Sequence, residues 1–301
     1  MKGKVIAIFG PTGVGKTAVA VALGERLGGN AVAISADALQ VYEGLPLLTG
    51  AATEAEQEQL EHRLLGFVPI NKTFSVGEFM PLAHREIDAA LEAGRTPIVV
   101  GGTGLYLRAA LSDLDLRPPP PADLRKRLEE EADSVGAEAM HARLAQRAPQ
   151  AAEKVPPGDR SRVIRLLELL EMGALEDEEP QVESQLWTEE TRHPTLLVGL
   201  TMDRAELYER IDRRVDTMVG AGALEEVKAA HEAGASATAR KALGFEDLLA
   251  GDIDAMKGRS RQYARRQLTW MRKLPNAELI DVTRRSPGDV AAEIARQSPS
   301  G

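Results

Sequence analysis

The sequence predicts an α/β protein with a parallel sheet and an inserted helical domain, and three observations support this prediction. First, strand-forming residues at 5–9 lead into a glycine-rich loop and then into a helical pattern from Ala18 to Leu27. Second, short apolar segments alternate with helical ones, as in sheets that helices cover on both faces. Third, a run of prolines at 118–121 opens a stretch that has helical periodicity only.

The glycine-rich loop matches the pattern G-x-x-x-x-G-K-T. Its residues are Gly10, Pro11, Thr12, Gly13, Val14, Gly15, Lys16 and Thr17. Between a strand and a helix, this pattern indicates a P-loop, whose backbone N–H groups surround a di- or triphosphate. The N-terminus of the following helix adds to the attraction for anions. We expect Lys16 to contact the terminal phosphates and the Thr17 hydroxyl to bind Mg²⁺, in a core that resembles P-loop NTPases.

The next elements are a strand at 31–35, an amphipathic helix at 76–93 and a strand at 97–100. Polar residues follow both strands, and ligands bind where parallel strands end. Asp37 is suited to binding Mg²⁺ or accepting a proton, and a turn or N-cap role is the alternative. Thr103 stands between glycines that allow a ligand to approach closely, and a simple tight turn is the alternative.

The second half of the chain predicts a helical insertion and then a return to the core. Residues 121–172 show helical periodicity, and 173–194 predict an acidic, poorly ordered connection. The later elements are a strand at 195–200, helices near 203–219 and 222–233, a basic helix near 258–274 and a strand near 278–280. We expect residues 1–116 and 195–301 to form the P-loop core and residues 117–194 to form the insertion.

The composition of the chain limits the kinds of site it can form and the compartment in which we expect it. The chain has 301 residues, 43% of them hydrophobic, and no cysteine, which excludes disulfides and thiolate metal sites. No apolar run approaches the roughly 20 residues of a membrane span. We therefore expect a cytoplasmic monomer that does not bind a membrane.

The charges are segregated along the chain, although the net charge is −9. Residues 174–190 carry seven acidic and no basic residues, and residues 257–273 carry seven basic and no acidic ones. On a helix with 100° per residue, Arg261, Arg265 and Arg272 fall within about 40° of one another. Arg266 widens this stripe, and we expect Tyr263, Trp270, Met271 and Leu274 to pack on the opposite face. A cationic stripe suits RNA phosphates, and a solvated helix without a partner is the alternative.

The residues alone leave three classes of function open. The first is an ATP-dependent P-loop kinase in which Asp37 activates a small acceptor. The second is a transferase whose loop holds the diphosphate of another donor and which acts on a nucleic acid. The third is a non-catalytic RNA-binding protein with a vestigial loop. The basic helix favours the second class. The mixed charges of the 203–219 helix predict a solvated face, and the alternative is that one or two of its arginines reach a diphosphate.

Five segments carry more specific motifs. They are 10–17 (G-P-T-G-V-G-K-T), 35–42 (S-A-D-A-L-Q-V-Y), 74–79 (F-S-V-G-E-F), 100–106 (V-G-G-T-G-L-Y) and 261–272 (R-Q-Y-A-R-R-Q-L-T-W-M-R). With these motifs in this order, the chain resembles the tRNA dimethylallyltransferase (tRNA isopentenyltransferase) family over nearly its whole length.

The resemblance implies transfer of a dimethylallyl group from dimethylallyl diphosphate to N6 of the adenosine 3′ to a tRNA anticodon, with release of diphosphate. Asp37 matches the general base of the family, Thr103 a residue that meets the adenosine, and Arg214 an arginine that assists at the diphosphate. Mg²⁺ is the implied cofactor, with Thr17 and Asp37 as its protein ligands. The residues expected to contact the tRNA anticodon stem-loop are Asp37, Ala38, Leu39, Gln40, Thr103, Arg125, Ser161, Arg162, Val163, Ile164, Arg165, Arg261, Arg265, Arg266 and Arg272.

Three segments depart from the family pattern. Residues 47–53 replace D-I-G-T-A-K-P and lose its lysine and proline, and residues 60–64 keep one histidine of P-H-H-L. Glu246 stands where the family has a basic residue. The expected catalytic residues lie outside these segments.

Overall fold

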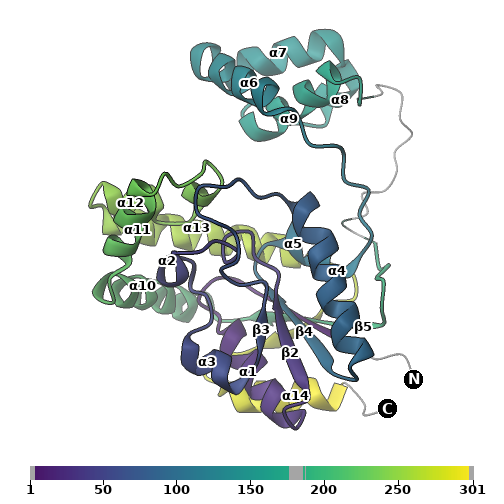
Figure 1. Cartoon of the computed structure of the whole chain (residues 1–301), viewed down its shortest axis with the longest axis vertical. Coiled ribbons are helices and arrows are strands. Elements are labelled where there is room, and N and C mark those ends of the chain that lie inside the picture. Colours follow the sequence, from purple (N-terminus) through teal and green to yellow (C-terminus); the bar gives the residue numbers. More distant parts are fainter. Residues whose placement is uncertain (1–3, 176–185, 187, 298–301) are drawn as a thin grey trace. The chain divides into compact units, whose positions relative to one another are not determined.

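The computed structural model describes residues 4–175, 186 and 188–297 (Figure 1). The chain divides into two compact units. The first unit comprises residues 1–114 and 186–301, and the second comprises residues 115–185. Half of the acidic connection expected at 173–194 lies outside the described residues, and residues 188–194 are grouped with the first unit.

A six-stranded parallel sheet forms the centre of the first unit, in the order β3-β2-β4-β1-β5-β6. The strands are β1 (Val5–Phe9), β2 (Ala31–Ser35), β3 (His62–Arg63), β4 (Thr96–Gly101), β5 (Thr195–Thr201) and β6 (Glu278–Asp281). Ile8 pairs with Val100 of β4 on one side and with Val198 of β5 on the other. All five residues of β1 are buried, as expected for a central strand that is covered on both faces. The predicted parallel α/β sheet is confirmed.

Helices cover both faces of this sheet (Figure 1). Those of the first unit are α1 (Lys16–Arg26), α2 (Pro46–Thr49), α3 (Glu54–Gln59), α4 (Val76–Glu92), α5 (Gly104–Leu111), α10 (Arg204–Gly220), α11 (Ala223–Glu232), α12 (Phe245–Leu249), α13 (Ile253–Met271) and α14 (Pro287–Gln297). Helix α1 packs against α3 and α14, and α4 packs against α5. Within the described ranges, no helix has both the length and the apolar character needed to span a bilayer.

Local signals fix where several helices begin. Ser75 and Glu78 form a capping box at the start of α4, in which each side chain bonds to the backbone N–H of the other residue. Thr53 and Glu56 form the same arrangement at α3. The basic helix α13 starts at Ile253, five residues earlier than its periodicity predicts, because the Asp252 side chain accepts a hydrogen bond from the Ala255 N–H.

The second unit is a small helical domain with its own core. Its helices are α6 (Ala122–Val135), α7 (Ala137–Arg147), α8 (Pro149–Glu153) and α9 (Arg160–Glu171). Leu128, Leu144 and Leu167 are fully buried together. The Glu168 carboxylate is also fully buried, and Arg125 binds it through two hydrogen bonds of 2.7 and 2.9 Å. A paired carboxylate inside so small a core fixes the position of α6 against α9, because an unpaired charge there would be costly.

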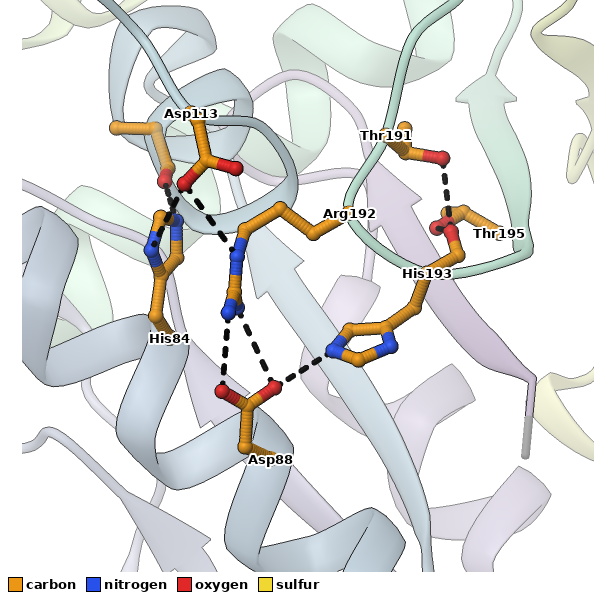
Figure 2. Close-up of polar contacts among 8 residues, drawn as sticks. His84, Asp88, Asp113, Thr191, Arg192, His193 and Thr195 are labelled. Atoms are coloured by element: carbon orange, nitrogen blue, oxygen red, sulfur yellow. Dashed lines mark hydrogen bonds and ion pairs between the residues drawn. The ribbon is translucent and has the colours of Figure 1, made fainter. Parts of the chain in front are cut away.

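A polar cluster ties the residues around 192 to α4 and to the end of α5 (Figure 2). The Arg192 guanidinium binds the Asp88 carboxylate at 3.0 Å and the Asp113 carboxylate at 3.4 Å. His193 Nε2 lies 2.6 Å from the other oxygen of Asp88. The Arg192 N–H donates to the Leu111 carbonyl at 2.8 Å. The two points where the chain leaves the first unit and re-enters it are therefore fastened side by side.

We expect Asp88→Asn to lower the stability of the protein by about 1 kcal/mol, or about 2–4 °C in Tm, near neutral pH. Burial raises the pKa of Asp88, but Arg192 and His193 more than offset this and hold it below its usual value. The stabilisation is therefore fully present above about pH 4, the unfolded-state pKa, and is lost as the pH falls through the lower folded-state pKa.

Thermal unfolding from pH 3 to pH 7 measures this difference, and Glu92→Gln, which neutralises an exposed carboxylate at the end of the same helix, is the control. Equal Tm values for Asp88→Asn and the parent protein at pH 7 would contradict the stabilising role of the cluster.

Candidate functional site

The glycine-rich loop lies between β1 and α1, and its glycines are required by geometry. Gly13 and Gly15 have φ values of 81° and 99°, in the left-handed region that side chains disfavour. A Cβ atom at Gly13 would also lie 2.9 Å from Cγ1 of Ile211 on α10. The loop ends where α1 begins, so the unpaired N–H groups of that helix border the site.

A cavity of about 590 Å³ opens beside this loop, and all of its lining residues belong to the first unit. Residues from the loop, from the end of β2, from α10 and from α13 line it. The lining includes Lys16, Thr17, Asp37, Arg214 and Tyr263, which are far apart in sequence. The structure thus brings together the loop, the aspartate and the arginine that the sequence singled out separately.

Two half-buried cations lie close together at the loop. Lys16 Nζ donates hydrogen bonds to the carbonyls of Gly10 and Pro11 at 2.9 and 3.1 Å. Burial and the nearby Arg214 lower the pKa of Lys16 to about 8, although Asp37 acts in the opposite direction. Burial likewise lowers the pKa of Arg214, and Asp37 opposes this. Positive charge concentrated where water is partly excluded favours a polyanionic ligand.

The Arg214 side chain is held from two sides. Its Nη1 donates to the Thr12 hydroxyl of the loop at 2.9 Å. On the other side lies Gly50, where a Cβ atom would come within 1.6 Å of Arg214 Nη2. Only a glycine at position 50 lets the chain pass this close to the guanidinium.

The segment around Gly50 is one that departs from the family pattern, and internal hydrogen bonds hold it in place. Glu226 on α11 accepts from the N–H groups of Leu47 and Leu48 at 2.9 and 2.8 Å. Gln40 donates from Nε2 to the Gly50 carbonyl at 3.1 Å and accepts from the Ser35 hydroxyl at 2.9 Å. Sequence reasoning missed Glu226, because a glutamate on a charged helix gives no local sign of its distant partner.

Asp37 forms a turn and also lines the cavity. Its Oδ1 accepts a hydrogen bond from the Leu39 N–H at 2.9 Å, which forms an Asx turn. Its side chain also lines the cavity, as do Thr17, Leu39 and Gln40. The turn therefore orients a partly exposed carboxylate beside the phosphate loop.

Thr103 is not among the residues that line the cavity. It is the residue before α5, and its hydroxyl lies 3.3 Å from the Tyr263 hydroxyl of α13. Tyr263 itself lines the cavity, and burial raises its pKa to about 12, with a further contribution from Asp37. Thr103 is thus connected to the cavity through Tyr263.

The basic helix differs in one respect from the predicted stripe. Arg261, predicted to be part of the RNA-facing stripe, forms an ion pair with Asp212 of α10, and Lys257 pairs with Asp216 of the same helix at 2.6 Å. Arg265, Arg266 and Arg272 are exposed.

The packing face of this helix also differs from the prediction. It is formed by Met256, Ser260, Ala264, Gln267 and Met271, whereas Tyr263 and Trp270 are only half-buried. Helix α10 crosses this region and supplies the acidic partners, which a helical wheel of α13 alone does not contain.

In the second unit, the predicted RNA-contacting residues differ in exposure. Ser161 and Arg162 are exposed at the start of α9, whereas the side chains of Val163 and Ile164 lie in the core. Arg165 binds Glu168 at 3.1 Å and the carbonyls of Arg117 and Pro118 at 3.0 and 2.7 Å. Arg125 and Arg165 thus both have internal partners.

The parallel sheet, the phosphate loop and the cationic cavity at the strand ends define a P-loop protein of the α/β class. Residues 40–274 match the family model of the IPP transferases. The chain belongs to this family.

Curated relatives and solved structures agree with this assignment. The chain is 39% identical to a tRNA dimethylallyltransferase of Halalkalibacterium halodurans, over 94% of this chain and 92% of the relative. It is 37% identical to another from Acidothermus cellulolyticus, over 97% and 92%.

Among solved structures, it resembles the tRNA isopentenylpyrophosphate transferase of Bacillus halodurans, with a TM-score of 0.71, 35% identity and coverage of 99% and 96%. A eukaryotic dimethylallyltransferase captured acting on tRNA matches with a TM-score of 0.79, 27% identity and coverage of 98% and 77%.

We expect Gly50→Ala to weaken the binding of inorganic diphosphate about tenfold, because the new methyl group displaces the Arg214 guanidinium and removes a charge-assisted hydrogen bond. Titration calorimetry measures this affinity. Gly44→Ala is the matched control, since Gly44 has a similar positive φ of 76° but no atom within 4 Å of a new Cβ. Both variants carry the backbone cost, so equal affinities in the two would contradict a role for Arg214 in binding the anion.

Proposed function

We propose that this protein transfers the dimethylallyl group of dimethylallyl diphosphate to N6 of the adenosine that follows the anticodon of a tRNA on its 3′ side. The observation that carries the proposal is the single cavity where the phosphate loop, Arg214 and Asp37 meet. Family membership supports it, as do the names of the relatives, which are tRNA dimethylallyltransferases.

The cationic end of the cavity suits the leaving group. As the bond between the allylic carbon and the diphosphate oxygen breaks, negative charge builds up on the diphosphate. Lys16 and Arg214 line the cavity beside the loop, so both are placed to stabilise this charge. Lys16 would exchange its hydrogen bonds to the loop carbonyls for bonds to the phosphate. Burial of both cations strengthens their interaction with the anion.

Mg²⁺ is the proposed cofactor, and its proposed protein ligands are the Thr17 hydroxyl and the Asp37 carboxylate. Both groups line the cavity, and oxygen donors are the ligands that Mg²⁺ prefers. The described residues contain no cluster of three or more acidic or histidine side chains suited to a metal, so the diphosphate and water must complete the coordination. The ion would supply further neutralisation of the leaving group.

Asp37 is the proposed base. When the N6 amine forms its bond to the allylic carbon, the nitrogen must lose a proton, and a carboxylate at the cavity wall is suited to accept it. The Asx turn with Leu39 holds the carboxylate at the wall of the cavity. Because the amine is a weak nucleophile, its placement next to the donor contributes much of the rate.

Access to the cavity requires an unstacked base. A stacked adenosine cannot reach a recessed site, so the nucleotide must be extruded from the anticodon loop. Tyr263 supplies a hydroxyl group for it at the cavity wall, and the proposed role of Thr103 is to act through its contact with Tyr263. Exposed positive charge for the phosphates comes from Arg265, Arg266 and Arg272. In the second unit, Ser161 and Arg162 are the exposed residues proposed to contact the RNA.

A direct assay tests the proposal. The protein is incubated with Mg²⁺, radiolabelled dimethylallyl diphosphate and unmodified tRNA with adenosines 3′ to the anticodon, and a parallel reaction contains ATP in place of the donor. Label in the RNA without ATP supports the proposal. ATP hydrolysis without RNA labelling would return the protein to the kinase class, which the relatives do not favour.

In this assay we expect Asp37→Asn to lower kcat by about 10²- to 10⁴-fold, the range that general-base catalysis contributes. Asparagine can still accept the Leu39 N–H, so the turn is kept while the base is lost. The affinity for tRNA, measured by filter binding, should change little. Near-normal transfer by Asp37→Asn would remove the proposed base.

We expect the double variant Arg265→Glu and Arg266→Glu to weaken tRNA binding at least tenfold and to reduce its dependence on salt, because fewer counterions are released. Arg296→Glu, which reverses an exposed charge on α14, is the control and should bind tRNA normally. Affinities measured from 50 to 300 mM KCl give the salt slope. A slope equal to that of the parent protein would show that α13 does not contact phosphates.

A further inference from the structure

The side-chain amide of Gln267 on α13 forms hydrogen bonds with two loops, the phosphate loop and the loop that follows β4. Its Oε1 accepts a hydrogen bond from the Thr12 N–H of the phosphate loop at 2.8 Å. Its Nε2 donates to the Gly102 carbonyl, in the loop after β4, also at 2.8 Å. The side chain is only 5% exposed. A buried amide whose donor and acceptor both bind backbone fixes the distance between these loops.

The glycines of the second loop are explained by this helix. A Cβ atom at Gly102 would lie 2.3 Å from Gln267 Nε2, and one at Gly104 would lie 2.0 Å from Cε3 of Trp270. Neither glycine has a positive φ, so the requirement comes from the close approach of α13 and not from backbone strain. The close approach of α13 therefore accounts for the glycines at positions 102 and 104 of the G-G-T-G sequence.

The two hydrogen bonds of Gln267 form a bridge between the loops, and this bridge is connected to the cationic part of the site. Thr12, whose N–H binds Gln267, accepts the hydrogen bond of Arg214 through its hydroxyl. A Cβ atom at Gly102 would also come within 3.4 Å of Lys16 Nζ. Gln267 is thus linked to Arg214 through Thr12, and Lys16 lies beside the glycine whose carbonyl Gln267 binds.

We propose that Gln267 is a positioning residue that sets the phosphate loop and the 101–104 loop at the separation needed to hold the diphosphate donor for reaction. This role rests on the proposed function. The Thr12 N–H points to Gln267, so the bridge also determines which loop N–H groups remain for the phosphates. Loss of the bridge therefore impairs use of the donor, while the exposed arginines of α13 still bind RNA.

The test compares Gln267→Met, which keeps the length and volume of the side chain but makes neither hydrogen bond, with Gln262→Met on the exposed face of the same helix. We expect Gln267→Met to lower kcat/KM for dimethylallyl diphosphate at least tenfold and to weaken the binding of inorganic diphosphate with Mg²⁺. Its affinity for tRNA should stay within about twofold of that of the parent protein. Gln262→Met should resemble the parent in its donor parameters.

A second variant, at another position, tests whether the loss of donor use comes from the broken bridge and not from misfolding of Gln267→Met. Gly102→Ala pushes the same amide away from the opposite side, so it should reproduce the loss of donor use, and combining it with Gln267→Met should add little. Donor parameters within twofold of the parent in Gln267→Met, an equal loss of donor and tRNA affinity, or additive effects in the double variant would overturn the proposal. Inorganic diphosphate binding tests Gln267 even if the parent protein transfers no label, which would instead reject the proposed function.

Discussion

Two half-buried positive charges that lie close together at the phosphate loop constrain much of the surrounding structure. Lys16 and Arg214 give up hydration, and their pKa values fall in consequence. Such an arrangement is stable only if other groups fix the cations, which the loop carbonyls do for Lys16 and Thr12 does for Arg214. The glycine at position 50 and the hydrogen bonds of Gln40 and Glu226 shape the chain around the same arginine. The site is thus prepared for an anion before one arrives.

Some basic residues of helix α13 and its C-terminal end form ion pairs with α10, and others are exposed. Lys257 and Arg261 neutralise aspartates of α10, which fixes the two helices that wall the cavity. Arg265, Arg266 and Arg272 remain exposed and give one face of an acidic protein a positive character. Between these groups lies Gln267, which is buried among the loops. One helix can therefore serve RNA affinity and donor placement with different residues.

The features predicted from the sequence are those with local signals. The strand at 5–9, the loop at 10–17 and the position of Asp37 after the strand at 31–35 follow from spacing and residue type. The structure brings the loop and Asp37 to one cavity where the strands end. Short helices such as α2 and α12 were missed because four or five residues carry too little periodicity. Gln267, Glu226 and the pairing of Arg261 were missed because their partners lie 49 to 255 residues away. A single sequence does not reveal such distant partners.

The fastening of residues 111 and 192 has a consequence for how this architecture can vary. The backbone hydrogen bond from Arg192 to Leu111, with the ion pairs around it, closes the sheet unit at the point where the chain departs. The second unit is inserted between residues 111 and 192, and the hydrogen bond between these residues already joins the two ends of the insertion. Insertions and deletions between those ends need not disturb the strands. The second unit can therefore be exchanged or enlarged during evolution while the residues of the core keep their arrangement.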